Sequence, residues 1–358
     1  MKVAVVGASG NVGTALLRAL ARDEAVTEVV GLASRVPSGT PPAPYDTASW
    51  TRVDLAEPGP DEPVVETLAG AFAGADAVVL LAWAMQPSHD RDLLHRTNVV
   101  GSARVIEAAA RARVPHLVVV SSIGAYSPVD DDEPRAETWA TEGVRSSEYS
   151  VDKVAVEHLL DQATTVHPQM RVARVRPALV FQRAAGSSIE RYFLGRFVPA
   201  ALLRRPLPLL PWPRGLRLQA VHADDLADLL RRVVVGRHDG AFNVAADDVL
   251  RGGDLAAVAS RGRFVEVPVV VARAAVAVAW HLRGIAMSPG WVDLAAGVPL
   301  MDTTRARTEL GWAPRWSALE AFADVLDGMA YGSGTASPPL RPRRRARRSL
   351  TGGQTAVR

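Results

Sequence analysis

A short apolar run near the N-terminus leads directly into a cluster of glycines, and this junction constrains the fold more than any other part of the chain. Residues 3–6 have the length of a strand, Gly7, Gly10 and Gly13 follow at intervals of three, and a stretch with helical periodicity comes next. Glycines allow a tight strand-to-helix turn and let backbone N–H groups approach a phosphate at the helix N-terminus. The spacing differs from the usual Gly-x-Gly-x-x-Gly fingerprint, but its position indicates a phosphate-binding turn. The residues of this turn expected to bind a dinucleotide cofactor are Gly7, Ser9, Gly10, Asn11, Val12 and Gly13.

Strand-like and helical segments alternate through the first half of the chain. The strand-like runs are residues 3–6, 28–32, 77–81, 116–120 and 171–175. Such alternation is typical of a parallel sheet covered by helices on both faces, with binding sites at the carboxyl ends of the strands. We therefore predict an α/β protein with a Rossmann-type, doubly wound parallel sheet and a smaller C-terminal substrate lobe.

The alternation loosens after residue 180, where apolar residues, Pro and Arg become frequent. We predict a dinucleotide-binding core over residues 1–180, with residues 219–245 returning to it, and a substrate lobe over most of 181–331. Residues 269–282 read as a buried or lid helix, because they are apolar but shorter than the ~20 residues that span a bilayer. Two late pieces, residues 219–225 and 241–245, are predicted to rejoin the main sheet.

The end of the chain has a different composition. Residues 332–358 carry seven Arg and no acidic residue, within a chain of net charge +3. This composition predicts a disordered, solvated basic tail whose removal leaves the fold intact. Contact of the tail with nucleic acid or anionic lipid is the less favoured alternative.

Tyr149 and Lys153 form the second informative feature. Lys and Arg together number 41 in the 358 residues, yet only two are Lys, so a lysine at this site indicates that a compact ammonium matters there. Residues 146–162 have a helical pattern, in which residues four apart share a face. An ammonium beside a phenol lowers its pKa, although a shift from about 10 to about 7 needs roughly 4 kcal/mol, more than one cation is expected to supply. A surface Tyr stacked on a surface Lys is the plain alternative for the pair alone.

The motifs occur along the chain in the same order as in a known family. Over roughly residues 1–330 the chain resembles an extended short-chain dehydrogenase/reductase of the NAD-dependent epimerase/dehydratase family. The matching segments are residues 7–13, 53–55, 79–82, 98–102, 119–126, 149–153, 176–181, 221–227 and 310–312. The resemblance implies Ser122, Tyr149 and Lys153 as the catalytic residues. Ser122 is preferred over Ser121 because it lies four residues before Tyr126, as the family's catalytic hydroxyl does. The resemblance also implies cofactor contacts from Asp54, Leu55, Leu81, Ala82, Tyr149, Lys153 and Pro177.

The choice of cofactor can be argued from the end of the second strand. Enzymes that prefer NAD place an acidic residue there, on the ribose 2′-hydroxyl. Here the chain reads Ser34-Arg35, and Arg35 offers donors for a 2′-phosphate. We therefore expect NADP ahead of NAD. The alternative is that Arg35 stacks on the adenine and does not distinguish the two.

Departures from the family pattern bear on the substrate. Sugar 4,6-dehydratases of the family share an Asp-Glu pair directly after the catalytic hydroxyl, where this chain has Ile123 and Gly124. Nucleotide-sugar epimerases often carry a diphosphate-facing Asn where this chain has Leu179. These departures favour a smaller or more apolar carbonyl compound over a nucleotide sugar. The lobe arginines that could still bind phosphates are Arg191, Arg196, Arg204 and Arg205.

Three other candidates have plainer explanations. His222 is expected to be a structural histidine rather than a catalytic one. The acidic run 130–133 is expected to be a solvated loop. Trp83 either walls the pocket or packs against its neighbours.

The function expected from these motifs is hydride transfer to or from a carbonyl or alcohol by an NAD(P)-dependent oxidoreductase, with Tyr149 as its acid/base. A nucleotide-sugar epimerase and a non-catalytic cofactor-binding regulatory protein remain as alternatives, and the intact Ser122 and Lys153 favour an enzyme. Cys is absent, which excludes disulfides and thiolate sites, and no metal site is predicted. No signal peptide or membrane span is apparent, so we expect a cytoplasmic protein with a small-molecule substrate. A homodimer is left open.

Overall fold

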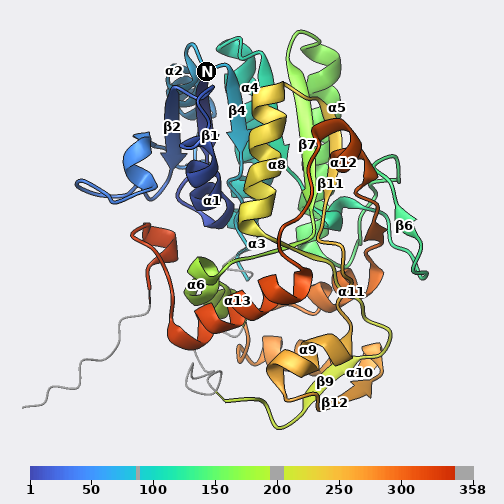
Figure 1. Cartoon of the computed structure of the whole chain (residues 1–358). Coiled ribbons are helices and arrows are strands. Elements are labelled where there is room, and N and C mark those ends of the chain that lie inside the picture. The colour runs from blue at the N-terminus through green and yellow to red at the C-terminus, as the bar shows by residue number, and fades with distance from the viewer. Residues whose placement is uncertain (86–88, 194–204, 343–358) are drawn as a thin grey trace, which may run out of the picture.

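The computed structural model describes residues 1–85, 89–193 and 205–342. In this part of the chain, seven parallel strands form one sheet in the order β11-β7-β5-β4-β1-β2-β3 (Figure 1). Their bounds are β1 Lys2–Val6, β2 Glu28–Ala33, β3 Ser49–Arg52, β4 Ala77–Leu80, β5 His116–Val120, β7 Arg171–Pro177 and β11 Gly240–Val244. The order reverses between β1 and β4, which is where ligands bind in sheets of this kind. The predicted doubly wound α/β fold is confirmed.

Helices cover both faces of the sheet because successive side chains of a strand point to opposite faces. Val3 and Val5 of β1 join the core beneath α1 and α8, whereas Ala4 and Val6 join the core beneath α2, α4 and α5. The bounds are α1 Asn11–Leu20, α2 Glu62–Phe72, α4 Gly101–Arg111, α5 Glu148–Val166 and α8 Ala223–Gly236. The helix predicted over residues 146–162 is thus present, and it runs a further turn.

In the main sheet one strand was missed, and one late segment was wrongly assigned to it. β3 escapes the sequence analysis because its four residues lie at the sheet edge and none of them is buried. The predicted return of residues 219–225 to the main sheet is wrong. Its strand, β10 (Ala220–His222), pairs with β8 (Leu179–Phe181) in a separate parallel pair. The other segment does return, as β11 beside β7.

The backbone changes its hydrogen-bonded partner strand between two consecutive residues. The Ala178 N–H donates to the Val244 carbonyl at 2.9 Å, and the next N–H, of Leu179, donates to the Gln219 carbonyl at 3.2 Å. The strand that leaves β7 therefore passes from β11 to β10 without an intervening loop. Core and lobe share this stretch of backbone.

The remaining elements build the lobe and its connections to the sheet, except α12, which packs against the core of the main sheet (Figure 1). They are α3 Arg91–His95, β6 Pro134–Arg135, α6 Gly186–Phe193, β9 Leu210–Pro213, α9 Gly252–Ala259, β12 Phe264–Val267, α10 Val269–His281, α11 Gly290–Gly297, β13 Leu300–Met301, α12 Thr304–Leu310 and α13 Ala318–Tyr331. α10 is not the buried helix that its composition suggests. It contains no buried residue, and Val270 is 77% exposed. Among the described residues, no helix is long and apolar enough to cross a membrane.

The first part of the predicted C-terminal tail is structured. α13 ends at Tyr331 and is followed by Gly332, whose φ of 65° suits a helix C-cap, but the chain then continues as packed structure to Pro342. It includes a 3-10 helix, Pro338–Leu340, and the side chains of Ser337 and Leu340 are buried. The prediction of disorder from residue 332 is therefore wrong for this stretch, because composition does not reveal its buried partners in the N-terminal half. The arginine-rich residues 343–358 lie outside the described part of the chain.

Candidate functional site

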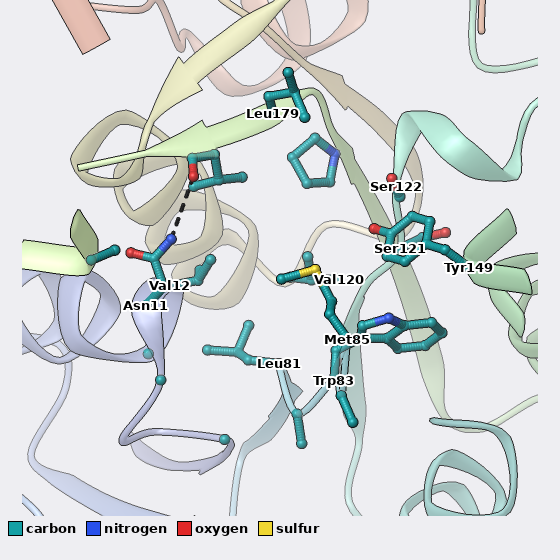
Figure 2. A pocket seen from close by; sticks show the side chains of 18 of the residues that line it. Asn11, Val12, Leu81, Trp83, Met85, Val120, Ser121, Ser122, Tyr149 and Leu179 are labelled. Atoms are coloured by element: carbon teal, nitrogen blue, oxygen red, sulfur yellow. Dashed lines mark hydrogen bonds between the residues drawn. The ribbon is translucent and has the colours of Figure 1, made fainter. Parts of the chain in front are cut away.

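A cavity of about 500 Å³ opens at the carboxyl ends of the central strands. Every residue predicted to bind cofactor or to react lines it: Gly7, Ser9, Gly10, Asn11, Val12, Gly13, Ser34, Arg35, Asp54, Leu55, Leu81, Ala82, Ser122, Tyr149, Lys153 and Pro177. Figure 2 shows Asn11 and Val12 on one side and Ser122 and Tyr149 on the other. The structure therefore brings the predicted residues together, while their individual roles stay predictions.

The glycines of the first turn permit close backbone contacts. Gly7 has a φ of 91°, and a Cβ built on it would lie 2.6 Å from the Ala82 backbone nitrogen at the end of β4. A Cβ on Gly13 would lie 2.4 Å from the Gly7 carbonyl oxygen. α1 begins at Asn11 without a side-chain cap, so its first N–H groups are available to an anion. This cradle fits the pyrophosphate of a dinucleotide.

Ser121 and Ser122 face different surroundings, as successive residues of an extended chain should. The Ser121 hydroxyl donates to Glu157 Oε1 at 2.7 Å. The Ser122 hydroxyl accepts the Gly124 N–H at 3.0 Å and also hydrogen-bonds the Tyr149 phenol. Ser122 is therefore the hydroxyl that shares the cavity with Tyr149, in agreement with the choice made from the sequence.

Lys153 lies about one turn after Tyr149 on α5, and its ammonium is buried. Its Nζ donates to the Val120 carbonyl at 3.0 Å and lies 3.4 Å from the centroid of the Trp83 ring, a cation–π contact. The same Trp83 ring meets Tyr149 edge-on, with 5.8 Å between ring centroids. Trp83 thus walls the cavity and contacts both Tyr149 and Lys153. Figure 2 shows Trp83 and Tyr149 on the same side of the cavity.

Burial controls the protonation of this pair. It lowers the pKa of Lys153 to about 7, although the Glu157 and Asp152 carboxylates act in the opposite direction. It raises the pKa of the Tyr149 phenol to about 12, opposed by the hydrogen bond with Ser122. The sequence predicts that Lys153 lowers the pKa of Tyr149, and the structure differs because the ammonium is directed at Val120 and Trp83. Tyr149 is accordingly a protonated phenol near neutral pH.

Two further residues that hold this wall carried no site prediction. Asn98, in a π-helical turn (Arg96–Val100), holds the backbone of Ala84, donating to its carbonyl at 2.9 Å and accepting its N–H at 2.8 Å. Trp291 of α11 stacks at an angle on Tyr149, with 4.8 Å between centroids. The segment that contains Asn98 matched the family as part of a helix, and that match implied no role for Asn98 in the site. Trp291 gave no local signal, because its contact depends on the folding of a distant segment.

Comparison with known proteins identifies the family. The model of the NAD dependent epimerase/dehydratase family matches residues 3–245. The chain belongs to this family. An uncharacterized protein of Mycobacterium tuberculosis is 25% identical over 343 residues, which cover 91% of this chain and 83% of that protein. An L-arabinose 1-dehydrogenase (NAD(P)(+)) of Haloferax volcanii is 32% identical over 168 residues, 44% of this chain and 59% of that protein.

Solved structures with the same fold include two sugar-nucleotide enzymes. The UDP-glucose 4-epimerase of Thermus thermophilus, in complex with NAD, superposes with a TM-score of 0.65 at 19% identity, over 92% of this chain and 99% of that one. The dTDP-glucose 4,6-dehydratase of Streptomyces venezuelae, with NAD bound, gives 0.65 at 18% identity, over 92% and 96%. At this identity the likeness concerns the fold alone.

Within this family framework, the substrate end of the cavity is mostly apolar. Its lining includes Leu179, Phe181, Trp291, Leu294 and Val298. Two polar side chains there already have protein partners. Arg217 Nε lies 2.6 Å from Asp132 Oδ1, and Gln219 accepts the Met301 N–H at 2.7 Å. The residues of this wall therefore offer little uncompensated charge to a substrate.

The remaining candidates lie away from the reacting groups. His222 is buried, stacks on Trp316 at 4.2 Å and accepts the Asp224 N–H, as expected of a structural histidine. The Asp132 carboxylate of the acidic run pairs with Arg217 and Arg251. Arg191 donates to the Pro339 carbonyl, and Arg205 lies outside the cavity lining. Arg196 and Arg204 lie outside the described residues.

The buried ammonium gives a prediction on stability. Between pH 7 and 10.5 the unfolded chain holds more protons on Lys153 than the folded protein does, because folding lowers the pKa from 10.5 to about 7. Stability due to this group therefore rises with pH across that window, by at most about 1.4 kcal/mol per pH unit. We expect the difference in unfolding free energy between the parent and Lys153→Met to shift in favour of the parent as pH rises. Urea unfolding over the window measures it, with Lys2→Met as the surface control. A pH-independent difference would contradict the prediction.

Proposed function

We propose that the protein is an NAD(P)-dependent oxidoreductase that transfers a hydride to or from a small or apolar carbonyl or alcohol compound. The observation that carries the proposal is the convergence of Ser122, Tyr149 and Lys153 on a cavity that also contains the glycine turn of a dinucleotide-binding family. A protein that only bound the cofactor would not need all three side chains around one cavity. The convergence therefore favours turnover over a purely regulatory role.

The chain's own residues divide the acid–base work. The nicotinamide supplies or accepts the hydride when it is bound. Ser122 orients the substrate oxygen by a hydrogen bond, and Tyr149, whose pKa is about 12, donates the phenolic proton to a carbonyl oxygen during reduction. In the reverse direction the phenolate needs a nearby positive charge, and Lys153, whose Nζ lies 5.8 Å from the centroid of the Tyr149 ring, supplies it in its protonated form.

The substrate class is proposed from the apolar wall. Leu179 replaces the amide that would meet a diphosphate, and Arg217 is already paired with Asp132. The related L-arabinose 1-dehydrogenase acts, by its name, on a free sugar. These observations support a substrate without a nucleotide. Epimerisation of a nucleotide sugar is the competing reaction, since the family includes such enzymes and fold alone does not decide function.

The preference for NADP is proposed from the end of β2. Ser34 and Arg35 line the adenosine side of the cavity, where an NAD-preferring enzyme has an acidic side chain. Among the described residues Arg35 forms no ion pair, so its guanidinium is available to a 2′-phosphate.

Catalysis is tested at the pair on α5. Tyr149→Phe should lower kcat by about 10²- to 10⁴-fold while leaving dinucleotide affinity nearly unchanged, because only the proton donor is lost. Lys153→Arg should also lower kcat, since a guanidinium does not fit the site of a buried ammonium. Steady-state kinetics and fluorescence titration provide the measurements, with the exposed Tyr331→Phe as the control. Near-parent activity in either active-site variant would defeat the assignment.

Cofactor preference is tested by calorimetric or fluorescence titration. The parent should bind NADPH more tightly than NADH, and Arg35→Ala should weaken NADPH binding about five- to ten-fold with little effect on NADH. Arg22→Ala, at another exposed arginine, is the matched control. Equal affinities in the parent would overturn the proposal.

Substrate class is tested by thermal shift with cofactor present. Ketones, aldehydes and sterol-like alcohols should stabilise the protein more than UDP- or GDP-sugars do, and Leu179→Asn should reduce that preference because it places a polar amide in the apolar wall. Stabilisation by a nucleotide sugar, lost in Arg205→Ala or Arg191→Ala, would reverse the ranking and favour the epimerase.

A further inference from the structure

Residues 333–342, named here the C-terminal strap, cross from the end of α13 to the glycine turn at the other end of the chain. The Ser337 hydroxyl donates to the Ser9 carbonyl oxygen at 2.6 Å, and the Tyr45 hydroxyl donates to Thr335 Oγ1 at 2.6 Å. In Figure 1 the strap is the red segment beside the blue N-terminal part. It lies outside residues 3–245, which the family model matches.

The strap is built into the wall of the cavity. Ser337 is fully buried, and Leu340 is 2% exposed. Pro339 and Leu340 line the same cavity as Ser9 and Gly10. The Thr335 N–H donates to the Leu340 carbonyl at 2.8 Å, so the strap closes on itself as a compact loop.

A second set of contacts holds the strap from the lobe side. The Ser187 N–H at the start of α6 donates to the Ser333 carbonyl at 3.3 Å, and Arg191 Nη2 donates to the Pro339 carbonyl at 3.1 Å. Neighbouring α6 residues Ser188 and Ile189 line the cavity. The strap therefore spans the space between the glycine turn and α6.

Its position predicts an effect on a bound diphosphate. An anion at the start of α1 lies beside Ser9 and Gly10, and the strap bonds directly to Ser9. The buried Leu340 excludes water from that side, and hydrogen bonds to charge are stronger where water is excluded. The exposed Arg341 adds positive charge next to this wall, which favours the approach of an anion.

We propose that the C-terminal strap is part of the dinucleotide-binding site, where it holds the glycine turn and covers the pyrophosphate side of the cavity. The proposal rests on the proposed function insofar as the ligand is a dinucleotide. A cover of this kind slows ligand release, because the ligand leaves on that side only when the strap detaches from Ser9 and Tyr45.

Two truncations separate the strap from the arginine-rich end. Removal of residues 333–358 should raise the Kd for NADPH at least about ten-fold, mostly through a faster off-rate, because affinity changes in related complexes are dominated by release. Removal of residues 343–358 leaves the strap in place and should keep the Kd within about two-fold of the parent. Stopped-flow NADPH fluorescence measures both rates, at a temperature where each protein is folded.

Point variants keep the test decisive if the longer truncation does not fold. Ser337→Ala removes the bond to Ser9, and Leu340→Ala opens the buried side of the cavity. Each should increase the off-rate several-fold, whereas Leu209→Ala, at an exposed leucine, should not. A role confined to folding would lower the melting temperature of the apoprotein and leave the off-rate unchanged.

The outcomes distinguish the two proposals. A parent that binds no dinucleotide overturns the proposed function and the strap's role together. A parent that binds NADPH with an off-rate unaffected by loss of the strap overturns the strap's role alone. Equal loss of affinity in both truncations also overturns it, because the effect then belongs to residues 343–358.

Discussion

The buried ion pair between Glu157 and Arg176 fixes α5 against the sheet, and the positions of Tyr149 and Lys153 depend on it. Arg176 Nε and Nη2 donate to the two Glu157 oxygens at 2.8 and 3.0 Å, a bidentate geometry that allows little rotation. Glu157 follows Lys153 by one turn of α5 and Tyr149 by two. A buried pair of this kind is weak evidence for stability, but removing one partner leaves an uncompensated charge. The pair therefore acts chiefly by fixing the position and rotation of α5 on the sheet.

Polar contacts on neighbouring turns of α5 connect the helix in the same way to the wall of the cavity. Asp152 receives the Arg91 guanidinium and the Asn98 amide, and Asn98 in turn holds the segment that follows β4. That segment carries Trp83 onto the Lys153 ammonium. Contacts of a single helix thus set the distances between the Tyr149 phenol, the Lys153 side chain and the Trp83 ring. This arrangement also explains why the helix is only weakly amphipathic, since much of its buried face is polar.

Local signals sufficed for six of the seven strands of the sheet, for the glycine turn and for the pairing of Tyr149 with Lys153, because each depends on residues close in sequence. Gly7 and Gly13 serve one strand-to-helix turn, and Tyr149 and Lys153 lie one helical turn apart. The missed features depend on distant segments. Ser337 meets Ser9 across 328 residues, and the pairing of β10 with β8 depends on where the β7 strand leaves the sheet. The pKa values of Tyr149 and Lys153 were also inaccessible, since burial dominates both and no sequence pattern gives the depth of a side chain.

The exchange of strand partners at Ala178 has a consequence for how the molecule is assembled. Domains joined by a linker can melt or be inherited separately, because few backbone hydrogen bonds cross the boundary. Here successive N–H groups, of Ala178 and Leu179, bond to the sheet and to the lobe. A cut near residue 180 would strip β10 of its partner and expose strand edges on both fragments. We therefore expect core and lobe to unfold together. Loops of the lobe can change in evolution without affecting this strand. Replacement of the whole lobe, however, would require rebuilding the strand that also carries Pro177 to the cavity.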